Sequence, residues 1–268
     1  MKEKSPFVEV RHLVRTFGNK RAVDDVSFTI APGEVFGLLG PNGAGKTTTI
    51  RVLTTLLRPT EGEVRIAGLD VTRHPAELRR ILGYVPQGLS ADGSLTGREN
   101  LLVVAKLLGL PRPIWERRTE EILRLLNLED AASRLVRTYA GGMVRRLEIG
   151  QAILHRPRLL VLDEPTVGLD PTARQGIWRM LGQLQEETGM TILVTTHYME
   201  EADAFCTRVA IMNRGKVVAI GRPAELKANI GRDDATLEDV FTAVTGDVLE
   251  SGGTYRDLRQ LGRRQRLG

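Results

Sequence analysis

Nine consecutive residues, Gly40 to Thr48, read GPNGAGKTT and fit the pattern G-x-x-x-x-G-K-[ST]. An apolar run over 33–40 predicts a buried strand before them, and helical spacing over 46–57 predicts a helix after them. In this context the backbone N–H groups of the loop and the helix N-terminus bind nucleotide phosphates. Lys46 is expected to reach the β- and γ-phosphates, and Thr47 to ligate Mg²⁺. The predicted phosphate-binding residues are Gly40, Pro41, Asn42, Gly43, Ala44, Gly45, Lys46, Thr47 and Thr48.

A second group of chemistry-bearing residues follows the apolar run LLVLDE, which ends in two carboxylates. Asp163 stands at the end of the predicted strand, where it is expected to hold Mg²⁺ through water. Glu164 points to another side and is expected to orient or deprotonate an attacking water. Alone, such a pair could be a solvated acidic turn, but an intact phosphate loop favours the catalytic interpretation.

A third candidate site is the segment YAGGM, where Gly141 and Gly142 open a predicted helix over 141–154. Glycine pairs occur where a backbone bends sharply or something comes very close to it. Ala140, directly before the pair, has no side-chain hydrogen bond to offer. The sequence therefore raises the question of what approaches these glycines.

Strand and helix patterns alternate along the chain and place these motifs in an α/β protein with a parallel sheet. Further strands are predicted over 7–14, 23–30, 62–68, 83–87, 158–165 and 190–197, with a hairpin over 208–221 that turns at 213–215. Further helices are predicted over 75–82, 100–110, 113–128, 172–187, 223–229 and 237–246. Residues 89–155 are expected to form an all-helical insertion, with Thr96 and Glu99 as a capping box.

Composition limits the possible classes of function. The chain has 268 residues, a formal net charge of +5 and one cysteine, Cys206, so no intrachain disulfide can form and a reducing compartment is expected. No signal peptide is recognisable, and no apolar run approaches the roughly 18 residues of a membrane span. Basic residues are scattered except in the tail over 247–268, and aromatic residues make up 4%. We therefore expect no specific nucleic-acid binding.

Together, the phosphate loop, the segment LVLDEPTVGLD and the glycine pair resemble the nucleotide-binding subunits of ATP-binding cassette (ABC) transporters over about residues 7–246. The segments GPNGAGKTTTIRVL, LRPTEGEVRIAG and LEDVFTAVTG look most like the ATPases of daunorubicin-resistance and ABC-2-type exporters. The resemblance implies a P-loop NTPase fold with a RecA-like core (about 1–88 and 156–221), an N-terminal antiparallel β-subdomain and a helical subdomain (about 89–155). One ABC ATPase domain is expected over 1–246, followed by the basic tail.

The same resemblance implies roles for four more residues. Phe17 matches the aromatic residue that stacks on adenine, although it could equally be a core residue. Gln87 matches the residue that senses Mg²⁺ and the γ-phosphate. Asp170 matches a loop that reaches across a dimer, and it also suits the N-cap before Pro171. His197, at the end of a predicted core strand, matches the histidine that contacts the γ-phosphate.

In the resembled family the glycine pair belongs to the segment L-S-G-G-Q, which approaches ATP held by a second subunit. This implies a dimer that sandwiches two nucleotides, with Ala140, Gly141 and Gly142 facing the partner's ATP; a homodimer is favoured and a heterodimer remains open. Ala140 replaces a serine that donates a hydrogen bond to the γ-phosphate, so that bond is absent here.

The resemblance thus implies an enzyme that hydrolyses ATP, with Mg²⁺, and drives a separate ABC-2-type transmembrane permease. Export of a drug-like, lipid or other hydrophobic compound is expected, with the chain cytoplasmic and peripheral on the inner face of the membrane. An alternative is a non-transport ABC ATPase that remodels the envelope by mechanotransmission. A P-loop kinase or GTPase is disfavoured, because the chain lacks an N-K-x-D guanine signature and has the glycine pair and His197.

Overall fold

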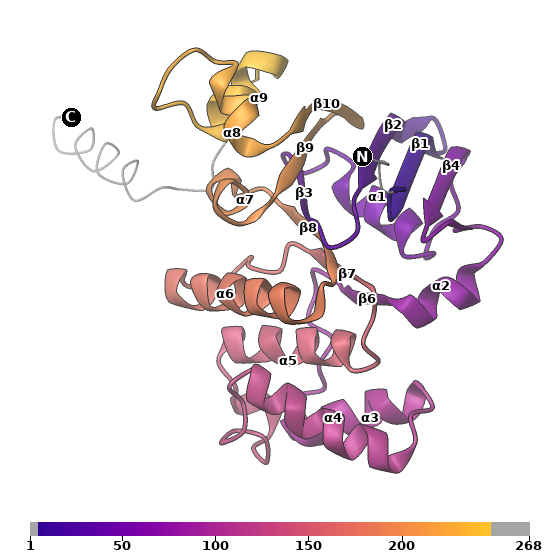
Figure 1. The fold of residues 1–268 in the computed structure, drawn as a ribbon, viewed down its shortest axis with the longest axis vertical. Coiled ribbons are helices and arrows are strands. Elements are labelled where there is room, and N and C mark those ends of the chain that lie inside the picture. Colours follow the sequence, from indigo (N-terminus) through magenta and orange to yellow (C-terminus); the bar gives the residue numbers. More distant parts are fainter. Residues whose placement is uncertain (1–4, 248–268) are drawn as a thin grey trace, which may run out of the picture.

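A computed structural model describes residues 5–247 and shows an α/β fold built on two sheets (Figure 1). The larger sheet has the strand order β10-β9-β3-β8-β7-β6. Its strands are β3 (Val35–Leu39), β6 (Leu82–Val85), β7 (Leu159–Asp163), β8 (Thr191–Thr196), β9 (Arg208–Asn213) and β10 (Lys216–Gly221). Neighbouring strands pair in parallel except β9 and β10, which form the predicted hairpin. The predicted α/β class is confirmed, with a sheet that is mixed at one edge.

The smaller sheet is antiparallel and has the order β2-β1-β4-β5. Its strands are β1 (Val8–Phe17), β2 (Lys20–Ile30), β4 (Glu61–Ile66) and β5 (Leu69–Asp70). Burial alternates at the start of β1 and in the second half of β2, as expected for strands with one face on a core. In β1 the alternation breaks at Leu13 and Val14, which are both buried, where the pairing with β2 and β4 shifts in register. The rings of Phe28 from β2 and Phe36 from β3 stack at 5.3 Å, so this sheet packs directly against the larger one.

The central strands of the larger sheet are buried along their whole length. Every residue of β7 and β8 is buried, because helices cover both faces of the parallel strands. These helices include α1 (Lys46–Leu53), α2 (Pro75–Ile81), α5 (Gly141–Ile153) and α6 (Pro171–Thr188). Asp170 caps α6 by accepting from the Ala173 amide at 3.0 Å, with Pro171 in the first turn as predicted.

Between β6 and β7 the chain forms a block of helices at one end of the molecule (Figure 1). It contains α3 (Gly97–Leu107), α4 (Arg112–Leu125), the 3₁₀ turn η1 (Val136–Thr138) and α5. The predicted capping box of Thr96 and Glu99 starts α3. Helix α5 lies between α6 and the pair α3 and α4, so it joins this block to the sheet (Figure 1). The predicted limits of a separate helical subdomain, 89–155, remain a prediction.

After β8 come α7 (Met199–Phe205), the β9–β10 hairpin, α8 (Pro223–Ala228) and α9 (Leu237–Thr245). The sequence patterns did not predict α7 and the two-residue strand β5. Helix α1 ends at Leu53, four residues before the predicted end, because Thr55 takes a left-handed conformation (φ 62°) and Leu56 and Leu57 donate back to the Arg51 carbonyl. Among residues 5–247, no helix is both long and apolar enough to cross a bilayer.

Candidate active site

The predicted phosphate loop connects β3 to α1, as its flanking patterns indicated. Gly40 has φ 144°, and a Cβ built on it would lie 2.2 Å from the Met212 carbonyl oxygen, so only glycine fits where the loop leaves the sheet. Helix α1 then starts at Lys46, with Gly45 as its N-cap and no side chain capping it. Its first N–H groups therefore remain available to a phosphate.

Lys46 is folded back over the loop and is almost completely buried. Its ammonium donates to the carbonyls of Gly40 (2.8 Å) and Pro41 (3.2 Å) and lies 3.3 Å from Glu164 Oε1. Burial lowers the pKa of Lys46, an effect that the nearby Glu164 carboxylate opposes. An anionic ligand would supply the charge that this ammonium otherwise obtains from Glu164.

Asp163 and Glu164 emerge together at the carboxyl end of β7, and Thr195 on β8 holds both. The Thr195 hydroxyl donates to Asp163 Oδ1 at 2.6 Å and accepts from the Glu164 amide at 2.9 Å. Asp163 Oδ1 also accepts from the Thr47 hydroxyl at 3.3 Å, which brings two of the three residues predicted at Mg²⁺ side by side. The third, Gln87, contacts Glu164. Thr195 was not predicted; two adjacent threonines at the end of β8 were its only signal.

The side chain of Glu164 is the point on which the other predicted catalytic residues converge. Its Oε2 accepts from Gln87 Nε2 at 3.1 Å, and its Oε1 lies 3.5 Å from His197 Nδ1 as well as near Lys46. Gln87 follows β6, and His197 follows β8. The carboxyl ends of parallel strands meet at one edge of the sheet, which is why three distant segments reach one carboxylate.

A cavity of about 550 Å³ opens beside these residues. Asn42 to Thr48, Gln87 and Glu164 line it, whereas Gly40 and Pro41 shape the loop behind it. Five residues absent from the predicted set also contribute to the wall: Lys20, Arg21, Ala22, Arg214 and Gly215. They come from the start of β2 and from the turn of the β9–β10 hairpin, which no single motif identifies. Their cations add positive charge where phosphates are expected.

Asp163 and His197 are not part of this wall and contact it through Thr47 and Glu164. Phe17 and Asp170 also lie outside it. Phe17 ends β1, is 45% exposed and has the Arg15 guanidinium 4.6 Å from its ring centre. It is therefore a surface aromatic residue and not a core residue, and it stands three residues before Lys20 in the same hairpin. The carboxylate of Asp170 is used as the N-cap of α6.

The glycine pair also lies away from this cavity, and packing within the chain explains Gly142 but not Gly141. A Cβ on Gly142 would lie only 2.9 Å from the Ala173 Cβ of α6, and one on Gly141 would lie 3.4 Å from Leu169. Gly142 thus lets α5 approach α6 closely within one chain. Ala140 is the N-cap of α5 and makes no side-chain capping bond, so the first amides of this helix have no side-chain partner from the cap.

The donor set at the loop fits a magnesium nucleotide. Thr47 and Asp163 offer a hydroxyl and a carboxylate, which are the hard oxygen ligands that Mg²⁺ accepts while phosphates supply the remainder. The described residues, 5–247, contain no cluster of three or more His, Cys, Asp or Glu side chains that could hold a metal without phosphates. The site therefore suits a metal that arrives with a phosphate ligand.

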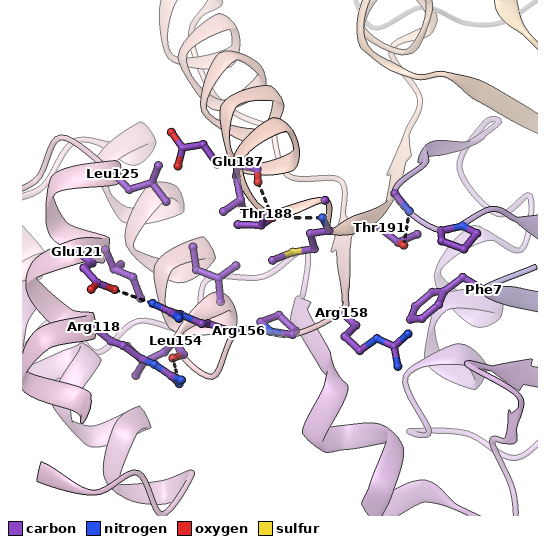
Figure 2. A pocket seen from close by; sticks show the side chains of 18 residues that line it. Phe7, Arg118, Glu121, Leu125, Leu154, Arg156, Arg158, Glu187, Thr188 and Thr191 are labelled. Carbon is purple, nitrogen blue, oxygen red and sulfur yellow. Dashed lines mark hydrogen bonds and ion pairs between the residues drawn. The ribbon is translucent and has the colours of Figure 1, made fainter. Parts of the chain in front are cut away.

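A larger cavity of about 760 Å³ lies at the opposite edge of the sheet (Figure 2). Phe7 and Arg158, which contact each other at 4.9 Å, line it on one side, and Arg118 and Arg156 on the other. None of the predicted site residues reaches it. The smaller cavity is the candidate site because it combines the phosphate loop with the convergent catalytic side chains.

Comparison with known proteins places this geometry in context. A family described as "ABC transporter" matches residues 23–167. The chain is 44% identical to the daunorubicin/doxorubicin resistance ATP-binding protein DrrA of Streptomyces peucetius over 84% of this chain and 68% of that protein. It is 42% identical to the Nod factor export ATP-binding protein I of Paraburkholderia xenovorans over 92% of this chain and 84% of that protein. A solved structure described as the ATP binding subunit of an ABC transporter matches with a TM-score of 0.79 and 30% identity, over 89% of this chain and 99% of the other.

Proposed function

The chain belongs to the ABC transporter family as an ATP-binding subunit that hydrolyses ATP, and from this premise we propose that it powers export of a hydrophobic compound through a separate ABC-2-type transmembrane permease. The observation that carries the proposal is the convergence of Lys46, Gln87 and His197 on Glu164 beside an intact phosphate loop. The names of the relatives, which refer to drug resistance and export, supply the cellular task. They also disfavour the alternative of envelope remodelling without transport.

In the proposed reaction, the loop amides and Lys46 bind the β- and γ-phosphates of ATP. Thr47 and Asp163 would hold Mg²⁺, which would supply positive charge against the phosphate oxygens. Glu164 takes a proton from a water whose oxygen attacks the γ-phosphorus, and the bond to the β–γ bridging oxygen breaks to leave ADP and phosphate. Gln87 and His197, which contact Glu164, orient this carboxylate and the water.

The chain is proposed to complete this site only as a dimer. Ala140, Gly141, Gly142 and Asp170 lie outside the wall of the cavity formed by their own chain. The uncapped N-terminus of α5 is suited to an anion. A second subunit would place this helix end over the γ-phosphate bound by the first, and two nucleotides would be sandwiched. A homodimer satisfies this arrangement with one kind of chain, whereas a heterodimer would pair Ala140 with another subunit's loop.

A docking surface for the permease is proposed on the block that follows Gln87. Leu89 is 69% exposed and Leu107 is 82% exposed, and Val103 and Leu108 are also exposed. Several exposed large apolar side chains in one segment of the chain favour a protein interface there. A cytoplasmic helix of the permease would cover them and would hold this chain at the inner face of the membrane. The basic tail, 247–268, lies outside the described residues except for Asp247.

Reconstitution tests this proposal. The purified chain alone should hydrolyse ATP weakly and move nothing across a vesicle, because 5–247 contain no membrane span. Addition of an ABC-2-type permease should raise ATP hydrolysis and produce ATP-dependent export. A Leu107→Asp variant should keep the basal rate of the isolated chain but lose the stimulation. Transport by the chain alone, or full stimulation of Leu107→Asp, would contradict the proposal.

A further inference from the structure

Helix α5 carries a buried ion pair that grips the loop containing Gln87. The Arg145 guanidinium donates to the backbone carbonyls of Pro86 (2.9 Å) and Gln87 (2.8 Å), one from each terminal nitrogen. Arg145 Nη1 also lies 3.0 Å from Glu148 Oε2, and the two side chains are only 4% and 1% exposed. One arginine therefore fixes the backbone at the start of the loop with the planar fork that only this residue type presents.

Glu148 holds the other end of the same loop. Its Oε1 accepts from the Ser90 amide and also from the Ser90 hydroxyl (3.2 Å) and the Ala91 amide (3.3 Å). A carboxylate that accepts several backbone and hydroxyl donors is a strong anchor, because each bond is charge-assisted. Arg145 and Glu148 together thus hold residues 86–91 from both sides.

Arg145 and Glu148, which together form a clamp on this loop, lie on the helix that begins at the glycine pair. Gly141 is its first residue, and Arg145 and Glu148 lie one and two turns further on. At the other end of the connection, the Gln87 side chain donates to Glu164. Leu89, the exposed apolar residue proposed for permease docking, lies between the part of the loop bound by Arg145 and the part bound by Glu148. A rigid path therefore joins the glycine pair, the catalytic carboxylate and the docking surface.

Packing alone does not require charge at these positions. A buried ion pair contributes little net stability compared with apolar residues of similar volume, since desolvation offsets most of its attraction. The advantage of the ion pair is that its hydrogen bonds fix the positions of four backbone groups of the loop. We propose that Arg145 and Glu148 are positioning residues that lock the Gln87 loop to α5, so that the glycine pair and Gln87 move as one unit. This inference rests on the proposed function for its consequence in the dimer.

Kinetic epistasis tests the clamp. Arg145→Lys keeps the charge but cannot reach two carbonyls as a fork. A misplacement of about 1 Å at a catalytic group can lower a rate by about 100-fold, so a partial displacement of Gln87 should lower kcat about tenfold. KM for ATP should change less than about twofold, since the phosphate loop is untouched. In a Gln87→Ala background the same substitution should have no further effect on kcat. The matched control is Arg118→Lys, an arginine on α4 that donates to the Leu154 carbonyl and does not reach the loop.

Hydrogen exchange tests the clamp without nucleotide. In the wild-type chain the Ser90 and Ala91 amides should be protected, and Glu148→Gln should speed their exchange about tenfold or more while the amides of β8 stay protected. Unchanged exchange at Ser90 and Ala91, or an equal loss of kcat from Arg145→Lys with and without Gln87, would overturn the clamp. A wild-type chain that neither binds nor hydrolyses ATP would instead refute the proposed function and leave the exchange result to decide the clamp.

Discussion

Replacement of Glu164 by glutamine is the perturbation whose consequences the structure defines best. The side chain is 6% exposed and contacts Lys46, Gln87 and His197. Glutamine has nearly the same shape, so the hydrogen bond with Gln87 and the contact with His197 can persist. The substitution removes the negative charge and the ability to accept a proton from water. It should therefore separate the catalytic role of Glu164 from its packing role.

The expected loss of rate follows from the role of general base. Such a group contributes about 10²- to 10⁴-fold, which corresponds to roughly 2.7–5.4 kcal/mol in the barrier. A second effect concerns the nucleotide-free chain, where Glu164→Gln leaves the buried Lys46 ammonium without its carboxylate. Removing one partner of a buried pair costs about 3–5 kcal/mol, and the lower end is expected because two loop carbonyls still accept from Lys46. Phosphates should restore the missing charge, so ATP should reverse this loss.

Three measurements test this reasoning. Steady-state hydrolysis should fall at least 100-fold, ATP affinity should be retained, and the variant should accumulate as an ATP-bound dimer detectable by mass. The melting temperature should drop without nucleotide and recover with ATP. Glu186→Gln, on the exposed side of α6, is the matched control and should behave as wild type. Turnover at the wild-type rate would refute the role of general base, and an unchanged melting temperature would refute the importance of the ion pair with Lys46.

Three further outcomes are expected. Ala140→Ser should raise ATPase activity severalfold, because a hydrogen bond to a charged phosphate is worth roughly 1.5–3 kcal/mol and the helix amides already compensate in part. No change in rate or ATP affinity would contradict this. Urea unfolding would report separately the gain of roughly 0.5–2 kcal/mol in stability that a better N-cap should give. Burial lowers the pKa of His155, so below about pH 6.5 the unfolded chain binds a proton that the folded chain does not bind, and the folded state loses stability. His155→Gln should therefore lose less unfolding free energy between pH 7.5 and pH 5.5 than the wild-type chain. Urea titrations at the two pH values would measure this difference. Burial raises the pKa of Cys206 to about 12, so a disulfide reagent at pH 8 should label it slowly in the native chain and at once in urea; rapid native labelling would contradict its burial.

The parts of the site that the sequence predicted are those in which chemistry depends on local spacing. The loop from Gly40 to Thr48 and the pair Asp163 and Glu164 are short segments that continue from buried strands, and the structure places them together as expected. Gln87 and His197 could be placed only through family resemblance, because a single polar residue after a strand has no pattern of its own. Their contacts with Glu164 follow from the parallel order of β6, β7 and β8.

The parts that the sequence did not predict depend on long-range contacts. Arg145 and Glu148 look like an ordinary solvated i, i+3 pair on a helix, and only the packing of α5 on the segment after β6 buries them. Similarly, Lys20 and Arg214 reach the cavity wall because two hairpins from different sheets meet there. The glycine pair is a more instructive case. Its sequence signal was assigned to a nucleotide, yet Gly142 also has a packing requirement against Ala173 within the same chain.

These two demands on α5 need not compete, since they concern different atoms. Packing against α6 uses the Cα face of Gly142, whereas an anion would be bound by the free N–H groups at the helix start. Close packing on α6 also restricts how α5 can move, and α6 begins at the capping residue Asp170. Any displacement of the α5 N-terminus therefore acts on α6 and, through Arg145, on the Gln87 loop. The helix that lacks a side-chain cap at Ala140 is thus held along its length by contacts that connect its free end to the catalytic carboxylate.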